Sequence, residues 1–594
     1  MPASFHKAVM SDSVPTALIF DTRSRQWQRF TGRIGRLRTT RPSEVLTTLQ
    51  AAVDAVHAHA CHAVGYLSYE AGAGLDPRLR TRTPDELPLV WFDLFEHVES
   101  VGPDLPYMPL EAGVSPVIDW TPSIEQSDYE LGIHRIREYL AAGDTYQTNF
   151  TFRLHAESRI APWPLFLHMI ARQGNGVGAF LNLDRWSVAS ASPELFFRLD
   201  GNHIVTIPMK GTAPRGHWSE QDQRQGEALA RDPKNRAENL MIVDMARNDL
   251  GRIADIGTVH TSKLFTIERY PTLWQMTSTV EARTSSGIPE IFQALFPAAS
   301  ITGAPKLRTC ELIAELETTP RNIYTGSIGW IAPGRKAQFN VPIRTLLFDH
   351  QRQTMEYGVG GGIVIDSTPA HEFEECRTKA EILRPAPPEF MLLESLRWTP
   401  IERYSRLHLH LARLQASADY FQFAIDPEAI NQYLRALENG LPLKPHKIRI
   451  TLQKDGTFHA EATELTPLPH PLRARLAAHP IDPGDPFLYH KTTLRRTYET
   501  ALAEADGADE ALLFNPDGEW TEFTIGNLFL QIDRTLYTPP LRCGLLPGRL
   551  RMELLQAGKA EERVLTLNDL AHASALFLGN SVRGLLPVTL LDPP

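Results

Sequence analysis

One lysine stands in a segment whose prolines and glycines predict a turn. The segment is IPMKGTAPRG, residues 207–216, in which Pro208 and Gly211 flank Lys210. A lysine in a turn usually points into water. A rigid turn can also aim the amine at a substrate, because a deprotonated lysine amine is a nucleophile. The local pattern leaves both interpretations open.

Carboxylates recur in segments that are otherwise apolar or rich in small residues. Glu194 lies in ASPELFF before an expected strand, and Glu238 lies near the start of a helix expected over 236–251. The segment HEFEECRTKA places Glu375 close to Lys379 in the chain. Each has a structural explanation, because a carboxylate near a helix start favours the helix dipole and an acidic run usually faces water. Singly, none of them establishes a site.

Two further segments could bind an anion through the backbone. SITGAPK contains Thr302 and precedes a helix expected over 305–317. Pro305 suits the first turn of that helix, so its free N–H groups could hold an anion. GVGGGIV contains Gly360 and Gly361, and glycine lets the backbone approach a ligand closely.

Length, charge and cysteine content limit the classes of function. A chain of 594 residues is too long for one core, so two or three domains are expected. The net charge of -10 argues against non-specific binding to nucleic acids or anionic membranes, and no apolar run is long enough to span a membrane. Four scattered cysteines without a CxxC pair indicate neither disulfides nor zinc. They favour the cytoplasm, and the N-terminal segment does not read as a signal peptide.

Proline-rich segments divide the chain. They predict the following parts: an N-terminal region over 1–115, a core over 120–384, a linker over 385–389 and a second domain over 390–594. Strands and helices mix without a regular βαβ rhythm. This mixture predicts an α+β fold with antiparallel sheet.

The first part of the core predicts a helix followed by a strand. Ser127 and Glu130 form an expected capping box, and Gly143 ends the helix. The strand TYQTNFTFRL has a second face that is wholly polar, made of Gln147, Asn149, Thr151 and Arg153. Such a face meets water or lines a polar pocket, and water is the favoured interpretation. Further strands are expected over 337–348 and 354–365.

Eight segments occur in an order that resembles the chorismate-utilising enzymes, the family of anthranilate, isochorismate, salicylate and aminodeoxychorismate synthases. They are SPELFF, PMKGTAPRG, AENLMIVDMARNDLGRI, SITGAPKLRTCELI, YTGSIGW, IRTL, GGGIV and EECRTKA. The resemblance covers about 120–384 and, more loosely, GYLSYEAGAG at 65–74. It implies a chorismate-binding antiparallel β-sandwich flanked by helices.

Three residues indicate which member of the family the core resembles. Aminodeoxychorismate synthases typically have a lysine at the position of Lys210, where anthranilate synthases have alanine. Isochorismate-forming members have a lysine at the position of Gln147, and amine-transferring members have glutamine. Gln275 stands where anthranilate synthase has histidine. The resemblance is therefore strongest to aminodeoxychorismate synthase component I.

This resemblance assigns roles to the candidate residues. Lys210 would attack C2 of chorismate, Glu194 would help the C4 hydroxyl to leave, and Gln147 belongs to the same catalytic set. Mg²⁺ would be held by Glu238 and Glu375. The substrate would be bound by Thr302, Tyr324, Arg344, Gly360, Gly361 and Lys379. Ammonia would then add at C4 and displace Lys210, and its source would be a separate glutamine amidotransferase subunit, because no glutaminase motif occurs in the chain.

A second set of motifs follows the proline-rich break. RLHLHLARLQASADYF has helical spacing and contains Arg413; YHKTTLRRTY contains Lys491. Alone, Arg413 reads as a surface arginine and Lys491 as one charge of a basic stretch. Together with GEWTEFTIGNLFLQ and LFLGNSVRGLLPV they resemble the fold-type IV pyridoxal-phosphate enzymes over about 390–594. That family implies a domain with two α+β subdomains and a possible homodimer.

The second resemblance also assigns roles. Lys491 would bind pyridoxal 5'-phosphate covalently, and Glu522 would pair with the pyridine nitrogen of the cofactor. The remaining contacts to the cofactor would come from Arg413, Asn527, Asn580 and Ser581. The family usually has an additional segment before its first strand. Here the domain starts directly at FMLLESLRW, so this end of the pocket is expected to be more open or to be completed by the preceding residues.

The two resemblances together imply consecutive reactions. The first domain would make 4-amino-4-deoxychorismate, and the second would eliminate pyruvate from it to give 4-aminobenzoate, the aromatic unit of folate. One alternative is an anthranilate synthase joined to a transaminase of the branched-chain or D-amino-acid type. A second alternative is a non-catalytic chorismate- or tryptophan-binding regulator. The complete set of Glu194, Lys210, Glu238 and Glu375 argues against this alternative.

Overall fold

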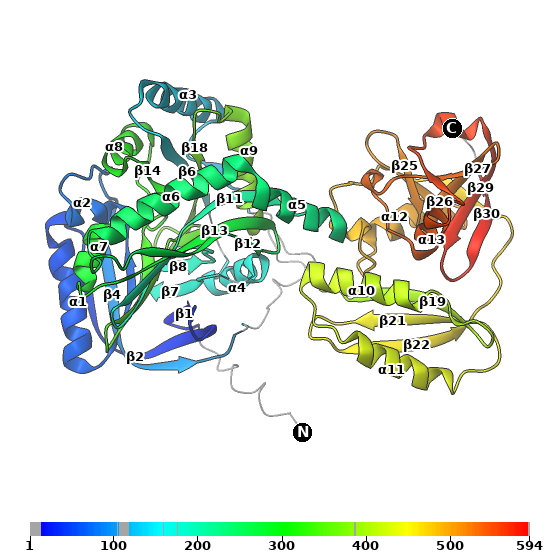
Figure 1. Cartoon of the computed structure of the whole chain (residues 1–594), viewed down its shortest axis with the longest axis horizontal. Coiled ribbons are helices and arrows are strands. Elements are labelled where there is room, and N and C mark those ends of the chain that lie inside the picture. Colours follow the sequence, from blue (N-terminus) through cyan, green and yellow to red (C-terminus); the bar gives the residue numbers. More distant parts are fainter. Residues whose placement is uncertain are drawn as a thin grey trace. The chain divides into compact units, whose positions relative to one another are not determined.

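The computed structural model describes residues 14–103, 105, 118–157, 160–174, 176–384 and 388–591. Most of the expected linker at 385–389 therefore lies outside the described residues. The described chain forms two compact units, shown in Figure 1. Residues within 14–215 and 225–384 form the first unit, and residues 216–224 and 388–591 form the second.

The first unit contains an antiparallel network of strands. The strands are β1 Ala17–Asp21, β2 Gln26–Thr39, β3 His62–Leu67, β4 Val90–Ser100, β5 Thr121–Pro122, β6 Gln147–Glu157, β7 Ala179–Leu183, β8 Trp186–Ser190, β9 Leu195–Asp200, β10 His203–Ile207, β11 Met209–Pro214, β12 His260–Arg269, β13 Leu273–Arg283, β14 Gly303–Ala304, β15 Ser327–Ala332, β16 Lys336–Asn340, β17 Thr345–Asp349 and β18 Thr354–Ile363. Hydrogen bonds join β14, β6, β18, β17, β8 and β7 in that order. All of these pairings are antiparallel, as the sequence predicts.

Helices cover this network of strands. They are α1 Val45–His59, α2 Gly72–Leu75, α3 Gln126–Ala142, α4 Pro162–Gln173, α6 Pro233–Gly251, α7 Ile288–Leu295, α8 Lys306–Leu316 and α9 Pro369–Ala380. In Figure 1, α3 and α9 lie beside β6 and β18. The helices predicted over 236–251 and 305–317 are confirmed as α6 and α8.

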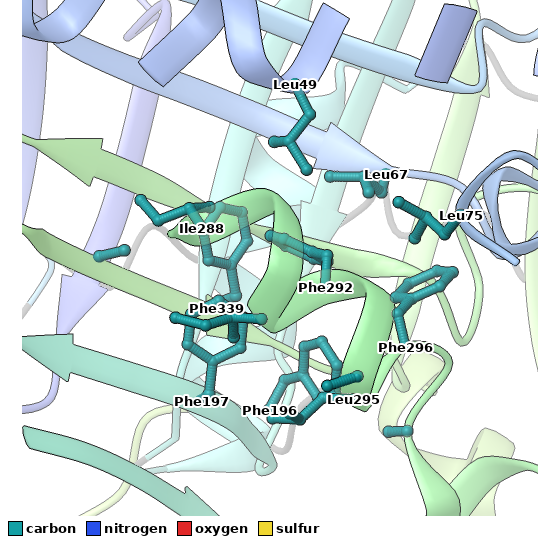
Figure 2. Close-up of a cluster of buried hydrophobic side chains, with 14 of the residues drawn as sticks. Leu49, Leu67, Leu75, Phe196, Phe197, Ile288, Phe292, Leu295, Phe296 and Phe339 are labelled. Carbon is teal, nitrogen blue, oxygen red and sulfur yellow. The ribbon is translucent and has the colours of Figure 1, made fainter. Parts of the chain in front are cut away.

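Aromatic side chains from distant segments form the core behind the start of β9. Figure 2 shows Phe292 of α7 against Phe339 of β16 and Phe197 of β9. The ring centroids of Phe292 and Phe339 lie 4.9 Å apart, and those of Phe197 and Phe339 lie 5.3 Å apart. Such pairs add to the stabilisation from burial. The core therefore fixes the strand that begins directly after Glu194.

The polar face of β6 is buried, so the favoured interpretation as a water-facing surface is wrong. The Thr151 backbone N–H and hydroxyl both donate to Glu317, at 3.0 and 2.8 Å. Arg321 donates to the carbonyl of Asn149 at 2.7 Å and forms an ion pair with Glu317 at 2.7 Å. Because the buried groups satisfy one another, a polar strand face is stable away from water.

Two local predictions differ from the structure. The expected capping box does not form, because α3 begins at Gln126 with Glu125 as its N-cap, so Ser127 is already inside the helix. Gly143 does end this helix, with a φ of 80°. The single strand expected over 337–348 is two strands, β16 and β17. Arg344, between them, has a φ of 52°, which a continuous strand cannot contain.

The second unit has two sheets with their own helices. Its elements are β19 Leu392–Thr399, β20 Arg403–Tyr404, α10 Leu407–Phe421, α11 Pro427–Glu438, β21 His446–Leu452, β22 Phe458–Glu464, β23 Leu472–Leu476, α12 Arg496–Glu504, β24 Glu510–Phe514, β25 Trp520–Phe523, β26 Gly526–Ile532, β27 Thr535–Thr538, α13 Arg549–Gln556, β28 Glu561–Glu562, α14 Leu567–Leu570, β29 Ala573–Asn580 and β30 Gly584–Leu590. Strands β19 to β22 form one sheet, which packs on α10 and α11, and β23 to β30 form the other (Figure 1). This is the expected domain with two α+β subdomains.

A short segment from the middle of the chain belongs to this second unit. Residues 216–224 include the first part of α5, Ser219–Arg231. Trp218 packs on Tyr489 with their ring centroids 5.3 Å apart, and Ser219 donates to the carbonyl of Ala416 at 3.2 Å. The proline-rich segments that divide the sequence did not predict that residues 216–224 belong to the second unit.

Candidate active site

Lys210 lies in strand β11 and not in the predicted turn. The strand starts directly after Pro208, and its register with β13 shifts between Met209 and Thr212, which marks a bulge. Gly211 in this bulge has a φ of 95°, a conformation that glycine adopts readily. A bulge re-aims the side chain next to it, so it does the positioning that the sequence assigned to a turn.

Two amides hold the backbone of this bulge. Gln275 of β13 donates to the carbonyl of Gly211 at 2.8 Å, and Asn239 of α6 donates to the carbonyl of Lys210 at 3.1 Å. Asn239 in turn accepts a hydrogen bond from the Ser278 hydroxyl at 2.6 Å. Gln275 stands where anthranilate synthase has histidine. Here it holds the backbone of the bulge next to Lys210.

The amine of Lys210 lies against Gly362, the last glycine of GVGGGIV. A Cβ atom on Gly362 would stand 2.2 Å from Nζ of Lys210 and 2.7 Å from Nε2 of Gln147. These three residues come from β11, β18 and β6, so the fold brings the predicted pair Lys210 and Gln147 together. Gly360 and Gly361 were predicted to contact the ligand from the sequence, and Gly362 was not. The signal was present, since a run of three glycines in a strand marks a close approach of backbone and ligand.

The side chain of Gln147 is fully buried, and among the described residues neither its nitrogen nor its oxygen has a hydrogen-bond partner. Buried amides are nearly always satisfied. A buried amide without a protein partner, beside a lysine amine, is therefore available to a small polar ligand.

Burial is the main cause that lowers the pKa of the Lys210 amine below its ordinary value. The charge of Lys379 acts in the same direction, and the carboxylates of Glu238, Glu375 and Glu372 oppose it. A lowered pKa increases the fraction of the neutral, nucleophilic amine at neutral pH. The same interactions show that predicted residues from two segments, α6 and α9, lie around Lys210.

Glu194 is a buried acid near this amine. Burial raises its pKa to about 7, against the opposing effects of the Ser300 hydrogen bond and the charge of Lys210. The Ser300 hydroxyl lies 2.5 Å from Oε1 of Glu194. A carboxyl group with a pKa near neutrality can donate a proton in a reaction. Ser300 lies in the segment SITGAPK, but its role beside Glu194 was not predicted from the sequence.

Helix α9 presents charged side chains to the glycine strand β18. A Cβ atom on Gly361 would stand 2.8 Å from Glu372 and 4.0 Å from Glu375. Glu375 forms an ion pair with Lys379 at 2.6 Å, and Lys379 donates to the carbonyl of Gly360 at 2.8 Å. The charge of Lys379 lowers the pKa of Glu375 and keeps it ionised. Glu372, one helical turn before Glu375, was missed.

The carboxylates around Lys210 do not make a complete metal site by themselves. Glu238, Glu372 and Glu375 all act on Lys210, yet among the described residues no three His, Cys, Asp or Glu side chains lie close enough to hold a metal alone. Zinc in a structural site needs four protein ligands, whereas Mg²⁺ takes one or two carboxylates together with water and substrate oxygens. The donor set therefore fits Mg²⁺ better than zinc.

Arg344 is a further cation of the first unit. Arg344 is held by Gln173, which accepts a hydrogen bond from it, and burial lowers its pKa. Tyr270 interacts electrostatically with both Arg344 and Glu194. A buried guanidinium without a carboxylate partner among the described residues is suited to an anionic ligand. A contact of Arg344 with a substrate carboxylate stays a prediction.

The other two predicted substrate contacts have structural partners. The Tyr324 ring packs on Gly358, where a Cβ atom would stand 2.2 Å away, and Arg153 lies over the ring at 5.0 Å. Lys379 acts on Tyr324, so this ring borders the same site. Thr302 is fully buried, and its hydroxyl donates to the carbonyl of Ala298 at 3.0 Å. A direct role of Thr302 in binding stays a prediction.

Lys491 is the buried amine of the second unit. Burial, with the charges of Arg413 and Arg495, lowers its pKa to about 7; Glu394 and Glu522 oppose this. The backbone carbonyl of Lys491 accepts from Leu393 of β19 at 2.9 Å. The interpretation of Lys491 as one charge of a solvated basic stretch is wrong, because the amine is enclosed by named charges.

Glu522 lies in a hairpin, directly opposite Asn527. Its carboxylate accepts from Tyr498 at 2.8 Å, from Asn527 at 3.0 Å and from the Leu546 backbone at 3.0 Å. Burial raises its pKa to about 7. Glu522 is therefore a fixed acid that can share a proton with a ring nitrogen.

Arg413 is buried at 6% exposure, so it is not a surface arginine. Two of its nitrogens donate to Glu394, both at 2.7 Å, and a third donates to the carbonyl of Pro547 at 3.3 Å. Glu394 also contacts His410 at 2.6 Å. Glu394 in LLESLRW was not predicted as part of the site, although a carboxylate in an apolar strand indicates a buried partner.

Asn580 and Ser581 lie where β29 ends and the chain turns into β30, and the Asn580 side chain holds the backbone of this turn. The Asn580 side chain accepts from the backbone N–H groups of Val582 at 3.1 Å and Arg583 at 2.9 Å. Ser581 lies half-buried in this turn. A buried amine, a buried acid and a buried arginine fit an aldehyde cofactor with a ring nitrogen and a phosphate, so the donor set suits pyridoxal phosphate.

Comparison with known proteins decides the family. A family model described as chorismate binding enzyme matches residues 15–385. The chain belongs to the chorismate-binding enzymes. The amino-transferase class IV family matches residues 391–591, and class IV enzymes imply pyridoxal phosphate as cofactor. Both resemblances stated from the motifs are confirmed.

Two relatives and one solved structure illustrate the likeness. Aminodeoxychorismate synthase component 1 of Klebsiella aerogenes is 40% identical over 275 residues, which cover 45% of this chain and 60% of that protein. Anthranilate synthase component 1 3 of Haloarcula marismortui is 32% identical over 368 residues, 54% of this chain and 72% of that protein. The structure of anthranilate synthase component I from Streptococcus pneumoniae has a TM-score of 0.52 at 20% identity and covers 64% of this chain and 94% of that one.

These matches differ in the share of the relative that they cover and in what they establish. The chain spans between 54% and 60% of the first four aminodeoxychorismate synthases that it matches. The structural likeness, at 20% identity, establishes the fold of this chorismate-binding enzyme and not its reaction. Over the part of the chain that the structure describes, no helix is long and apolar enough to cross a membrane.

Proposed function

We propose that this chorismate-binding enzyme converts chorismate and ammonia to 4-amino-4-deoxychorismate in its first unit and eliminates pyruvate from that product in its second unit. The final product is then 4-aminobenzoate, for folate synthesis. The observation that carries the proposal is Lys210, a buried amine with a lowered pKa beside the unpartnered amide of Gln147. The 40% identity to an aminodeoxychorismate synthase supports the same choice.

In the first reaction the neutral amine of Lys210 attacks C2 of chorismate, and the ring double bonds shift as the C4 hydroxyl leaves. Glu194, with a pKa of about 7, supplies the proton that lets this hydroxyl leave as water. Ammonia then attacks C4, the double bonds shift back, and Lys210 leaves from C2. Gln147 lies next to the amine and orients the incoming nitrogen.

The substrate is a dianion, so its carboxylates need cations. Arg344 with Tyr324 would bind the enolpyruvyl carboxylate, and the backbone of the glycine strand with Lys379 would assist. Mg²⁺, held by Glu238 and Glu375 with Glu372 beside them, would neutralise the ring carboxylate. Thr302 completes the proposed contacts.

In the second unit, Lys491 would hold pyridoxal phosphate, and Glu522, with Asn527 beside it, would pair with the ring nitrogen. Arg413 and the backbone near Asn580 and Ser581 would bind the phosphate. When bound, this cofactor acts as an electron sink. Nζ of Lys491, with a pKa of about 7, takes the proton from C4 of the substrate. The C3–oxygen bond then breaks, pyruvate leaves, and the ring becomes aromatic.

Ammonia must come from a partner in this proposal. All four cysteines are buried, so none is placed as the exposed nucleophile of a glutaminase. A separate glutamine amidotransferase subunit is therefore the proposed source. The cysteines are also unpaired, which suits the reducing cytoplasm as the compartment. A homodimer through the second unit remains part of the proposal.

The test uses the purified protein with chorismate, an ammonium salt, Mg²⁺ and pyridoxal phosphate. We expect 4-aminobenzoate and pyruvate in equal amounts. Anthranilate as the aromatic product would contradict the first assignment and support the alternative of an anthranilate synthase joined to a transaminase. Chorismate binding without turnover would support a non-catalytic regulator and contradict both assignments.

A further inference from the structure

The sheet of β19, β21 and β22 has an apolar face and a cationic face. Leu396, Ile448 and Ile450 point into the core formed with α10 and α11. On the opposite face, the antiparallel register places Arg397 opposite Lys447. Residues directly opposite in such a pair lie about 4.5–5.5 Å apart at Cβ, and like charges there are destabilising. The like charges of Arg397 and Lys447 therefore destabilise this part of the sheet, and their own strands do not offset this effect.

A third cation extends this row. Arg449 stands two residues after Lys447, on the same face, opposite Ser395. Its acidic neighbour is Glu461 of β22, which lies opposite it in the register. The two charged groups are 4.0 Å apart and exposed, so the pair is a loose one. One exposed carboxylate does not balance three cations.

Two cations from loops of the second subdomain act on the same row. Arg583 lies in the turn after β29, and Arg495 stands directly before α12, four residues after Lys491. Burial is the main cause that lowers the pKa of Lys447; the charges of Arg449, Arg583 and Arg495 act in the same direction, and Glu461 opposes them. The five cations come from β19, β21 and these two loops, so their meeting is a property of the fold.

Arg397 supplies an independent sign of an absent partner. Its Nε atom is buried and has no hydrogen-bond partner among the described residues. A buried charged donor without an acceptor is costly, and native structures normally satisfy it. An anionic ligand would supply the acceptor.

This cationic face adjoins Lys491. The Leu393 backbone donates to the carbonyl of Lys491 at 2.9 Å, and Leu393, Ser395 and Arg397 share one face of β19. At about 3.3 Å per residue, Arg397 stands roughly 13 Å along the strand from Leu393. Arg495 acts electrostatically on both Lys491 and Lys447, so it interacts with a lysine at each end of this stretch of β19.

We propose that Arg397, Lys447 and Arg449, with Arg495 and Arg583 facing them, form the subsite that binds the carboxylates of a dianionic substrate beside Lys491. This inference rests on the proposed function, in which that substrate is 4-amino-4-deoxychorismate with its ring and enolpyruvyl carboxylates. These cations would distinguish such a substrate from an amino acid with a single carboxylate.

The test compares Arg397→Met and Lys447→Met with the parent protein loaded with pyridoxal phosphate. Each variant should raise the KM for supplied aminodeoxychorismate about tenfold or more, the effect of losing one charge-assisted hydrogen bond, with a smaller change in kcat. Lys447→Arg should recover most of the loss. Lys444→Met is the matched control, because Lys444 is exposed and pairs with Glu464 at 3.0 Å.

A purely structural role predicts a different result. It would lower the Tm or the bound cofactor absorbance together with activity, whereas a binding role leaves both unchanged. The parent KM should also rise with ionic strength, and this dependence should weaken in the Arg397→Met, Lys447→Met double variant. An active parent with variants within twofold of its KM would overturn the inference and leave the proposed function standing. A parent without lyase activity would overturn the proposed function itself.

Discussion

At the scale of single residues, the amine of Lys210 determines the first reaction. Lys210→Ala removes the nucleophile but leaves the bulge backbone and its hydrogen bonds to Gln275 and Asn239. We expect aminodeoxychorismate formation to fall by at least about a hundredfold, with the Tm close to that of the parent. Product is measured by coupling to added lyase. An unchanged rate would exclude Lys210 as the nucleophile.

Ser300 is a positioning residue for Glu194, and its role is visible in the pH profile. The pKa of Glu194 is about 7, and the Ser300 hydrogen bond stabilises the charged form. Because the acid must be protonated, the synthase rate should fall as pH rises through this pKa. Ser300→Ala removes the stabilisation, raises the pKa and should move this falling limb to higher pH. Ser300→Thr keeps the hydroxyl, so its synthase rate should fall at the same pH as that of the parent. An equal shift of this pH in Ser300→Ala and Ser300→Thr would contradict the positioning role of Ser300.

At the scale of secondary structure elements, the bulge of β11 orients the catalytic amine. Gly211→Ala places a Cβ 3.1 Å from Asn235 at a φ of 95°. We expect a loss of about 1–2 kcal/mol in the free energy of unfolding. The synthase kcat should fall as well, because the amine is displaced.

The matched control for this element is Gly257→Ala. Gly257 has a φ of 79° and open space around its would-be Cβ, so it carries similar backbone strain away from Lys210. Thermal unfolding should show comparable losses for the two variants, and steady-state kinetics should show a lower kcat for Gly211→Ala alone. Equal kcat values would mean that the bulge conformation does not position Lys210.

At the scale of the whole molecule, the two sites lie in separate compact units and share no residue. Lys491→Ala should therefore abolish pyruvate release from aminodeoxychorismate and leave the first reaction unchanged. With chorismate, ammonium and Mg²⁺ supplied, the variant should accumulate aminodeoxychorismate, measured by chromatography. Loss of the visible absorbance of bound cofactor should accompany this. Release of 4-aminobenzoate at the parent rate would exclude the second unit as the lyase.

Much of the family assignment and of the candidate site could be read from the sequence. The order of eight segments indicated the chorismate-binding enzymes, and single positions such as Lys210 and Lys491 carried the expected chemistry. The helix end at Gly143 was also predictable. These features depend on residue type, on order and on spacing within one element, and such information is present in the chain before it folds.

Tertiary structure alone decided which groups meet. The polar face of β6 is buried because Glu317 and Arg321 satisfy it, and Arg413 is neutralised by Glu394. Ser300 reaches Glu194 from 106 positions away. In each case the state of a polar group depends on a partner distant in the chain. Local patterns favour water for such groups, and only the folded arrangement supplies the hydrogen bonds that make their burial stable.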